Sequence, residues 1–316
     1  MRCLITGASG FLGSHLARAL AGEGHEVLAI VRPSSDLWRL DDIKAKLSFA
    51  FASLNTIETV REPIAQFRPE VAFHLAWTGG NSSKFVNQTA QVSENVPGTL
   101  GLVRILAEAG CATVVYAGSS MEYGEFNVPV TESDLPKPAN LYGAAKYGAE
   151  VLTSGLCHAY GMRFCGVRVF WTYGPMDDAM RMIPSVIASL LDAQRPRLTE
   201  GRQLWDFLYI DDAVRAFVLL ASTVSSEGVF NLGSGQPVAI REVVESIRDR
   251  IDPSLELGFG EVPYGPNQVM HLQPDVSRLQ TAIGWRPEVG LIDGIRRTVE
   301  WHRAQRMSQS SVRRTD

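Results

Sequence analysis

The stretch Thr6-Gly-Ala-Ser-Gly-Phe-Leu-Gly13 decides the fold that this chain is expected to adopt. It follows residues 2–6, an apolar run typical of a short buried strand, and it precedes a helical pattern marked by Leu16 and Leu20. Glycines at this spacing allow a tight turn and a close approach of the backbone to a pyrophosphate, which the helix N-terminus then faces. The stretch therefore predicts a dinucleotide-binding turn, with an ordinary glycine-rich turn as the alternative.

The second predicted strand, residues 26–31, runs into Arg32-Pro-Ser34-Ser35. An acidic residue at this place binds the ribose 2′-hydroxyl of NAD, whereas a guanidinium suits the 2′-phosphate of NADP. Arg32, with the hydroxyls of Ser34 and Ser35 as further donors, therefore favours NADP(H). NAD remains possible, because an arginine at a strand end can also be a plain surface residue.

Strand and helix patterns then alternate up to residue 170, and their ranges in chain order are 47–52, 56–67, 71–76, 88–109, 113–117, 142–160 and 163–170. This alternation predicts an α/β fold with a Rossmann-type, doubly wound parallel sheet. Past residue 171 the pattern is less regular, which is most simply explained by a smaller, discontinuous C-terminal substrate lobe. We expect the dinucleotide-binding domain at 1–170 and 205–233, the substrate lobe at 171–204 and 234–304, and a disordered polar tail at 305–316.

Composition narrows the classes of function. The chain has 316 residues, 45% of them hydrophobic, and a net charge of −4, which gives no reason to expect nucleic acid or an anionic membrane as a partner. No apolar run approaches the length of a membrane span. We expect a cytoplasmic protein with no metal site, because the cysteines are scattered and read as reduced and mostly buried, at positions Cys3, Cys111, Cys157 and Cys165.

Tyr142 and Lys146 are the candidate acid–base pair. Four residues apart in a predicted helix, they share one face. A phenol has a reference pKa of about 10, and a neighbouring ammonium favours the phenolate. The pair is therefore expected to pass a proton near neutral pH.

Several short motifs, in this order, resemble those of one known family. They are Thr6-Gly-Ala-Ser-Gly-Phe-Leu-Gly13, His74-Leu-Ala76, Asn95-Val-Pro-Gly-Thr99, Ser119 with Tyr123-Gly124, Tyr142-x-x-x-Lys146, Tyr173-Gly-Pro175, Asp206-Phe-Leu-Tyr-Ile-Asp-Asp212, Asn231-Leu-Gly-Ser-Gly235 and Gly284-Trp285-x-Pro287. Along nearly its whole length the chain resembles an extended short-chain dehydrogenase/reductase of the NAD-dependent epimerase/dehydratase type, which acts on nucleotide sugars.

The resemblance implies roles for individual residues. Tyr142 would be the general acid/base, Lys146 would hold the nicotinamide ribose and lower the Tyr142 pKa, and Ser119 would hydrogen-bond the reacting oxygen. Besides that pair, cofactor contacts are expected at Gly7, Ser9, Gly10, Phe11, Leu12, Gly13, Arg32, Ser34, Leu54, Leu75, Ala76, Asn95 and Phe170. Substrate contacts are expected at Thr78, Ser120, Met121, Trp171, Arg181, Arg202 and Trp205.

Departures from the family pattern narrow the reaction. Ser120 and Met121 stand where dehydratases of the family carry an acid and a base, and methionine cannot abstract a proton, so dehydration is not expected. Glu122, one position further on, is interpreted as a solvated or local structural residue. His74 is interpreted as packed or hydrogen-bonded rather than catalytic.

The substrate end departs too. Trp171 replaces the family's usual Asn, Trp205 replaces an Arg that grips the diphosphate, and residues 264–270 lack another usual Arg. The two tryptophans can stack on a base or a sugar, or can simply be core residues. Arg181 and Arg202 are candidates for the diphosphate, or surface charges.

We therefore expect NADPH-dependent reduction of a nucleotide-sugar ketone, a 4-keto-6-deoxyhexose of deoxysugar biosynthesis, with the proton from Tyr142. The alternative is a nucleotide-sugar epimerase that keeps NAD tightly bound. A catalytically silent dinucleotide-binding regulator ranks lower, because the chain retains both Tyr142 and Lys146. The resemblance also implies a homodimer that pairs through helices 88–109 and 142–160.

Overall fold

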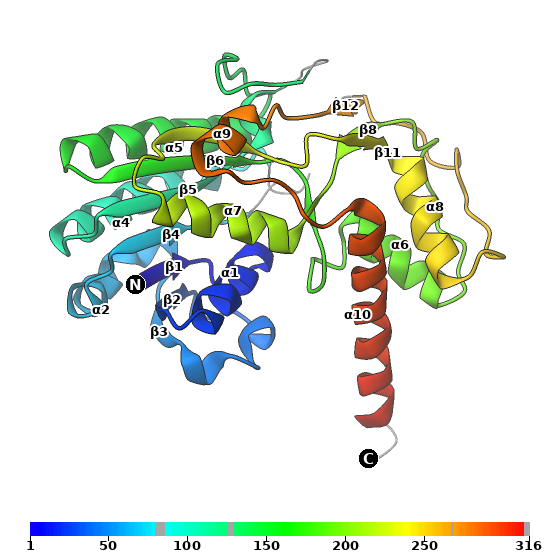
Figure 1. Ribbon diagram of the computed structural model, residues 1–316, viewed down its shortest axis with the longest axis horizontal. Helices are drawn as coiled ribbons and strands as arrows, with labels where there is room; N and C mark the ends of the chain where they lie inside the picture. The colour runs from blue at the N-terminus through cyan, green and yellow to red at the C-terminus, as the bar shows by residue number, and fades with distance from the viewer. Residues whose placement is uncertain (80–85, 125–128, 267, 313–316) are drawn as a thin grey trace.

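The computed structural model describes residues 1–79, 86–124, 129–266 and 268–312. Its centre is a seven-stranded sheet in which every strand is parallel to its neighbours (Figure 1). The strands lie in the order β10 (Gly228–Leu232), β6 (Arg163–Val169), β5 (Thr113–Ser119), β4 (Val71–His74), β1 (Arg2–Thr6), β2 (Glu26–Val31) and β3 (Ser48–Phe51). The predicted Rossmann-type α/β fold is confirmed.

Helices cover both faces of this sheet (Figure 1). One face carries α1 (Phe11–Gly22), α7 (Ile210–Ser222) and α9 (Ser277–Ile283); the other carries α2 (Arg61–Phe67), α4 (Asn95–Glu108) and α5 (Leu141–Ala159). Successive residues of β1 point to opposite faces of the sheet: Cys3 and Ile5 belong to one apolar cluster, and Leu4 belongs to the other. This two-sided burial explains why the strands read as continuous apolar runs.

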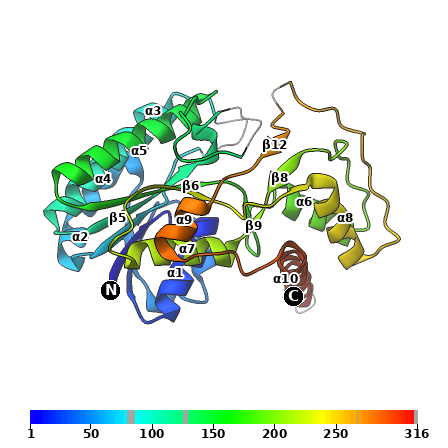
Figure 2. The same cartoon turned by 45° about the horizontal axis from the view of Figure 1, so that its top comes forward.

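A smaller sheet lies apart from the first (Figure 2). It consists of β11 (Pro237–Ala239), β8 (Leu204–Asp206) and β12 (His271–Leu272), in that order. Three helices pack near it: α6 (Met182–Leu191), α8 (Ile240–Ile251) and α10 (Leu291–Val312). A short parallel pair, β7 (Thr172–Tyr173) and β9 (Leu208–Tyr209), lies between the two parts. The proposed division into two domains remains a prediction.

Two predicted segments differ from the structure. The helix predicted at 88–109 is divided into α3 (Ala90–Ser93) and α4. Pro97 lies in the first turn of α4 and has no N–H for the carbonyl of Ser93, so one continuous helix cannot form there. The tail predicted to be disordered from residue 305 continues α10 as far as Val312, because Arg306 donates from α10 to the Ala188 carbonyl and pairs with Asp192.

The short 3₁₀ helices complete the described elements: η1 (Trp38–Leu40), η2 (Lys44–Lys46), η3 (Leu54–Val60) and η4 (Ser120–Glu122). As predicted, all four cysteines are free thiols and are buried. Within the described ranges, no helix combines the length and the apolar character that a membrane span requires. The homodimer remains a prediction. On α5, one of the two helices predicted to pair, Val151 and Leu152 are 51% and 48% exposed.

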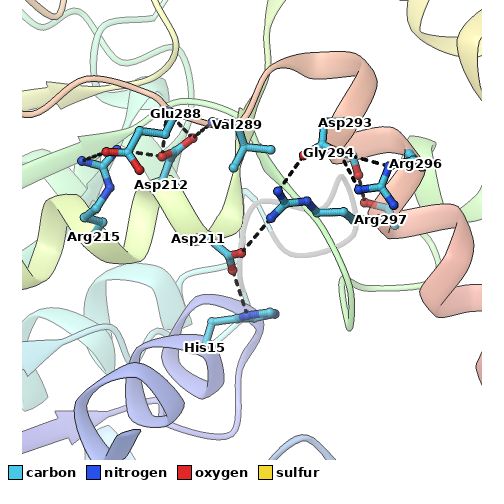
Figure 3. Close-up of polar contacts among 11 residues, drawn as sticks. His15, Asp211, Asp212, Arg215, Glu288, Val289, Asp293, Gly294, Arg296 and Arg297 are labelled. Carbon is cyan, nitrogen blue, oxygen red and sulfur yellow. Dashed lines mark hydrogen bonds and ion pairs between the residues drawn. The ribbon is translucent and has the colours of Figure 1, made fainter. Parts of the chain in front are cut away.

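Asp212 ties α7 to the segment that leads into α10 (Figure 3). Its carboxylate accepts from the N–H groups of Glu288 at 3.0 Å and Val289 at 2.8 Å, and from Arg215 Nη2 at 2.8 Å. The side chain is only 2% exposed. Its neighbour Asp211 is 57% exposed, lies 4.0 Å from the ring of His15 and pairs with Arg297 at 3.9 Å.

We predict that Asp212→Ala lowers the free energy of unfolding by about 3 kcal/mol, because it leaves two partly buried N–H groups and the Arg215 guanidinium without their acceptor. The matched control Asp211→Ala should change it by less than about 0.5 kcal/mol, because that carboxylate is solvated. Urea unfolding followed by circular dichroism measures both. Equal losses in the two variants would contradict this account of the junction.

Candidate active site

A cleft opens at the carboxyl ends of the first four strands, where parallel α/β sheets hold their ligands. Its walls come from the loops after β1, β2, β3 and β4. They include seven of the residues predicted to contact a cofactor, namely Gly7, Ser9, Gly10, Arg32, Leu54, Leu75 and Ala76. Thr78, predicted for the substrate, also lines this cleft, as do Ser35 and Trp77.

The glycines of the first loop fit a dinucleotide. Gly7 has a φ of 71°, and a Cβ there would lie 2.9 Å from the backbone nitrogen of Ala76. A Cβ on Gly13 would collide with the carbonyl oxygen of Gly7. Only residues without a side chain can adopt this backbone at positions 7 and 13. Because the loop is bare there, its main-chain N–H groups and the start of α1 can face a pyrophosphate.

Other predicted cofactor residues lie outside the cleft wall. Phe11 and Leu12 pack against the apolar cluster of the C-terminal part, and Ser34 is exposed. Asn95 is buried and accepts from the Thr78 N–H at 2.7 Å, so it shapes the loop after β4. Phe170 is buried among apolar side chains.

His74 is a structural residue, as predicted. Its Nδ1 lies 2.7 Å from Thr6 Oγ1 and its Nε2 lies 2.9 Å from Thr99 Oγ1. Burial lowers its pKa to about 3, so the ring is neutral at physiological pH. It joins β4 to β1 and α4 beneath the cleft.

The structure brings Ser119, Tyr142 and Lys146 together. Ser119 ends β5, and the other two lie in the first turns of α5. Ser119 Oγ accepts from the Met121 N–H at 3.2 Å and is hydrogen-bonded to the Tyr142 phenol. Because Oγ accepts from the backbone, the Ser119 hydroxyl is the donor in its bond to the Tyr142 oxygen. The three residues form the hydroxyl, phenol and amine set that the motifs predict.

The backbone around Tyr142 explains how it reaches Ser119. Asn140 caps α5 by accepting from the Gly143 N–H at 2.9 Å. A Cβ on Gly143 would collide with the Met121 carbonyl oxygen, so the glycine allows α5 to approach η4 closely. Ser120 and Met121, predicted for the substrate, lie within η4 beside this contact.

The expected lowering of the Tyr142 pKa is not found. Burial raises the pKa of Tyr142 to about 12, and the hydrogen bond from Ser119 only partly opposes that rise. Lys146 instead donates its Nζ proton to the carbonyl of Ala117 at 2.7 Å and lies 4.0 Å from the centroid of the Trp77 ring. Burial lowers the pKa of Lys146 to about 7, opposed by the charges of Glu122 and Glu150.

The interpretation of Glu122 as solvated is wrong. Its side chain is fully buried: one oxygen accepts from the Ser119 N–H at 2.7 Å and the other from Arg168 Nε at 3.1 Å. It is a local structural residue, the second reading offered for it. Arg168 and Glu150 were missed; only the spacing of Glu150, four residues after Lys146 on one helix face, signalled it.

Trp77 was also missed. It lies three residues after the end of β4, directly after the strand predicted at 71–76, and lines the cleft, and its ring meets the Tyr142 ring edge-on with centroids 6.2 Å apart. Its Nε1 donates to Gln91 at 2.6 Å, which fixes the ring over Lys146. A tryptophan immediately after a strand of the sheet was the signal in the sequence.

Three of the predicted substrate residues meet. The rings of Trp171 and Trp205 have centroids 4.8 Å apart, and the guanidinium of Arg181 lies 4.5 Å from the Trp171 centroid. Arg181 also pairs with the buried carboxylate of Asp177 at 3.0 Å. Arg202 does not join them: its side chain is 75% exposed and pairs with Glu200, because it lies on the solvent side just before β8.

Comparison with known proteins agrees with this geometry. Residues 3–233 match the model of the NAD-dependent epimerase/dehydratase family. A curated relative, the UDP-glucuronate 4-epimerase of Thermodesulfobacterium geofontis, is 27% identical over 94% of this chain and 95% of its own length.

Solved structures give the same result. The UDP-glucose 4-epimerase of Thermotoga maritima, solved with UDP-glucose, aligns with a TM-score of 0.88 and 25% identity over 96% of this chain and 99% of that one. The UDP-glucose 4-epimerase of Thermus thermophilus, solved with NAD, aligns with a TM-score of 0.82 and 25% identity over 96% and 99%.

We predict that Gly7→Ala weakens NAD(H) binding at least about tenfold, because a left-handed alanine costs about 1–2 kcal/mol and its Cβ intrudes on Ala76. Isothermal titration calorimetry measures the dissociation constant. Gly22→Ala is the control, since a Cβ on Gly22 meets nothing within 4 Å. Equal affinities in the two variants would exclude this loop as the pyrophosphate site.

Proposed function

Because this chain belongs to the NAD-dependent epimerase/dehydratase family, we propose that it oxidises and re-reduces one hydroxyl-bearing carbon of a nucleotide sugar. The observation that carries the proposal is the meeting of Ser119, Tyr142 and Lys146 beside a cleft shaped for a dinucleotide. That arrangement suits a reaction in which negative charge develops on a sugar oxygen as hydride is transferred.

The form of this chemistry that the comparisons favour is 4-epimerisation with a retained cofactor. The relative and both solved structures described above are named as 4-epimerases. They support the epimerase alternative better than the ketone reductase expected first from the sequence. A UDP-sugar is the substrate class that their names suggest.

Each residue of the set has a definable task. When bound, the nicotinamide supplies hydride transfer. The Tyr142 oxygen takes the proton of the sugar hydroxyl and later returns it. Ser119 donates its hydroxyl hydrogen to the same sugar oxygen. When the cofactor is bound, the ammonium of Lys146 would hydrogen-bond its ribose and would stabilise a phenolate on Tyr142, against the burial that raises the phenol pKa.

Elimination of water is disfavoured by the same geometry. Met121 has no proton to exchange, and both oxygens of Glu122 are engaged by Ser119 and Arg168. Glu122 therefore cannot serve as the acid or base that a dehydratase needs. This supports epimerisation or reduction over dehydration.

Reduction is the second candidate, and Arg32 favours it. Arg32 and Ser35 line the cleft at the end of β2, where the adenosine ribose is expected. A guanidinium there suits NADP(H), which reductases consume, and not the retained NAD of an epimerase. We propose that Arg32 contacts a 2′-phosphate.

The substrate end consists mainly of aromatic surface. We propose that Trp171 and Trp205 stack on the base or the sugar of the substrate, with Arg181 beside them. Arg181 shares its charge with Asp177, so it is a weaker diphosphate ligand than a free arginine. This end of the site is where the chain departs most from its family.

The test uses purified protein with UDP-glucose or UDP-glucuronate and a trace of NAD. An epimerase converts the sugar to its C4 epimer, seen by NMR, with no net change in absorbance at 340 nm. Tyr142→Phe should lower that rate by about 10²–10⁴ through loss of the acid–base group. Steady consumption of NADPH with a 4-keto sugar, and no epimer, would replace the first proposal by the second.

We predict that Arg32→Ala raises the dissociation constant of NADPH about tenfold and leaves that of NADH within about twofold, because one charge-assisted contact to the 2′-phosphate is lost. Titration of both reduced cofactors by fluorescence measures the ratio. The control is Arg104→Ala, which removes a half-exposed arginine of α4 that pairs with Glu58. A wild-type protein that already binds NADH more tightly would exclude the assignment.

A further inference from the structure

Four charged groups are buried together beneath the site. Glu122, Glu150, Arg168 and Lys146 are 0%, 2%, 4% and 4% exposed. A charge removed from water to this extent is strongly destabilising unless partners of opposite sign surround it. The positive and negative charges of these four groups therefore have to offset one another.

Arg168 lies between the two carboxylates. Its Nη2 donates to Glu150 Oε1 at 2.6 Å, and its Nε donates to Glu150 Oε2 at 3.2 Å and to Glu122 Oε2 at 3.1 Å. These residues come from α5, β6 and η4. We call Glu122, Glu150 and Arg168 the buried ion cluster.

Two glycines make room for it. A Cβ on Gly118, which pairs with Arg168 across β5 and β6, would lie 2.7 Å from Glu122 Oε1. A Cβ on Gly166 would lie 3.3 Å from Glu150 Oε2. The sheet thus omits side chains at two positions where the carboxylates need space.

With both carboxylates ionised, the buried ion cluster carries one surplus negative charge, since two carboxylates face one guanidinium. Lys146 lies one helical turn before Glu150 on α5, where an ammonium offsets this surplus, and both carboxylates act to raise its pKa against the effect of burial. Three further titratable groups of the described residues near Lys146 are uncharged at neutral pH: Tyr116 has its pKa raised well above 10, Tyr142 has its pKa raised to about 12, and His74 has its pKa lowered to about 3.

Glu122 also links the cluster to the hydroxyl of the site. Burial and the charge of Glu150 raise the pKa of Glu122, while Arg168 and the Ser119 N–H oppose that rise. Both of its oxygens accept from N–H donors, an arrangement that stabilises the ionised form. The same carboxylate thus acts on Lys146 by charge and on Ser119 by a hydrogen bond.

We propose that Glu122, Glu150 and Arg168 are positioning residues that keep Lys146 protonated and hold Ser119 at the end of β5. The consequence for turnover rests on the proposed function, because it assumes that Lys146 acts as an ammonium. The protonation of Lys146 itself can be measured with neither substrate nor cofactor.

The experiment is an NMR titration of the full chain labelled with ¹³C-lysine, with the Lys146 resonance identified by its loss in Lys146→Met. In Glu122→Gln the pKa of Lys146 should fall by about one unit, and in Glu150→Gln it should fall in the same direction. Asp212→Asn is the control, since it alters a buried carboxylate on α7, which covers the opposite face of the sheet from α5 (Figure 1). A purely structural role predicts no difference between the cluster variants and this control.

An unchanged or raised Lys146 pKa in both glutamine variants would overturn the proposal, and either variant alone decides it if the other does not fold. Once a substrate is known, the alkaline limb of the pH–rate profile should move to lower pH by the same amount as the Lys146 pKa. A Lys146 shift without that change in the profile would count against the proposed role of Lys146 in turnover, and not against the buried ion cluster.

Discussion

A buried ammonium group is the constraint on which the rest of this site depends. Lys146 is removed from water beneath the cleft, and its charge is offset by the Ala117 carbonyl, the face of Trp77 and the carboxylates of Glu122 and Glu150. These partners lie on four separate segments, so the cation is stable only when the sheet holds all of them in place. The parallel sheet meets this requirement because its strands are packed on both faces and end at one edge.

The parts of the site that follow from local sequence could be predicted. The glycines at 7 and 13 are required by a local backbone turn. The helix beginning at Leu141 places Tyr142 and Lys146 on one face regardless of what surrounds it. Ser119 ends a strand whose edge is fixed by the order of the sheet. Short-range geometry and the alternation of strands and helices are enough for these features.

The parts that depend on distant partners could not be predicted. Glu122 looks like a surface residue in the sequence, and only Arg168, 46 residues further along, makes its burial possible. The high pKa of Tyr142 follows from burial by neighbours that the Tyr–Lys spacing does not reveal. Residues 305–312 are polar and read as a tail, but contacts of Arg306 with α6 extend α10 through them.

The glycine loop and the predicted substrate residues differ in how closely they match the pattern of the family. Around Gly7 and Gly13 the geometry depends on backbone and glycine, so the fold alone can preserve it at low sequence identity. The residues predicted to bind the substrate are side chains that meet one another, and two of them are tryptophans. Arg181 is already paired with Asp177 and stacked on Trp171, so a diphosphate arriving there competes with a buried carboxylate for the same cation. The substrate site proposed for this chain therefore relies on stacking more than on charge.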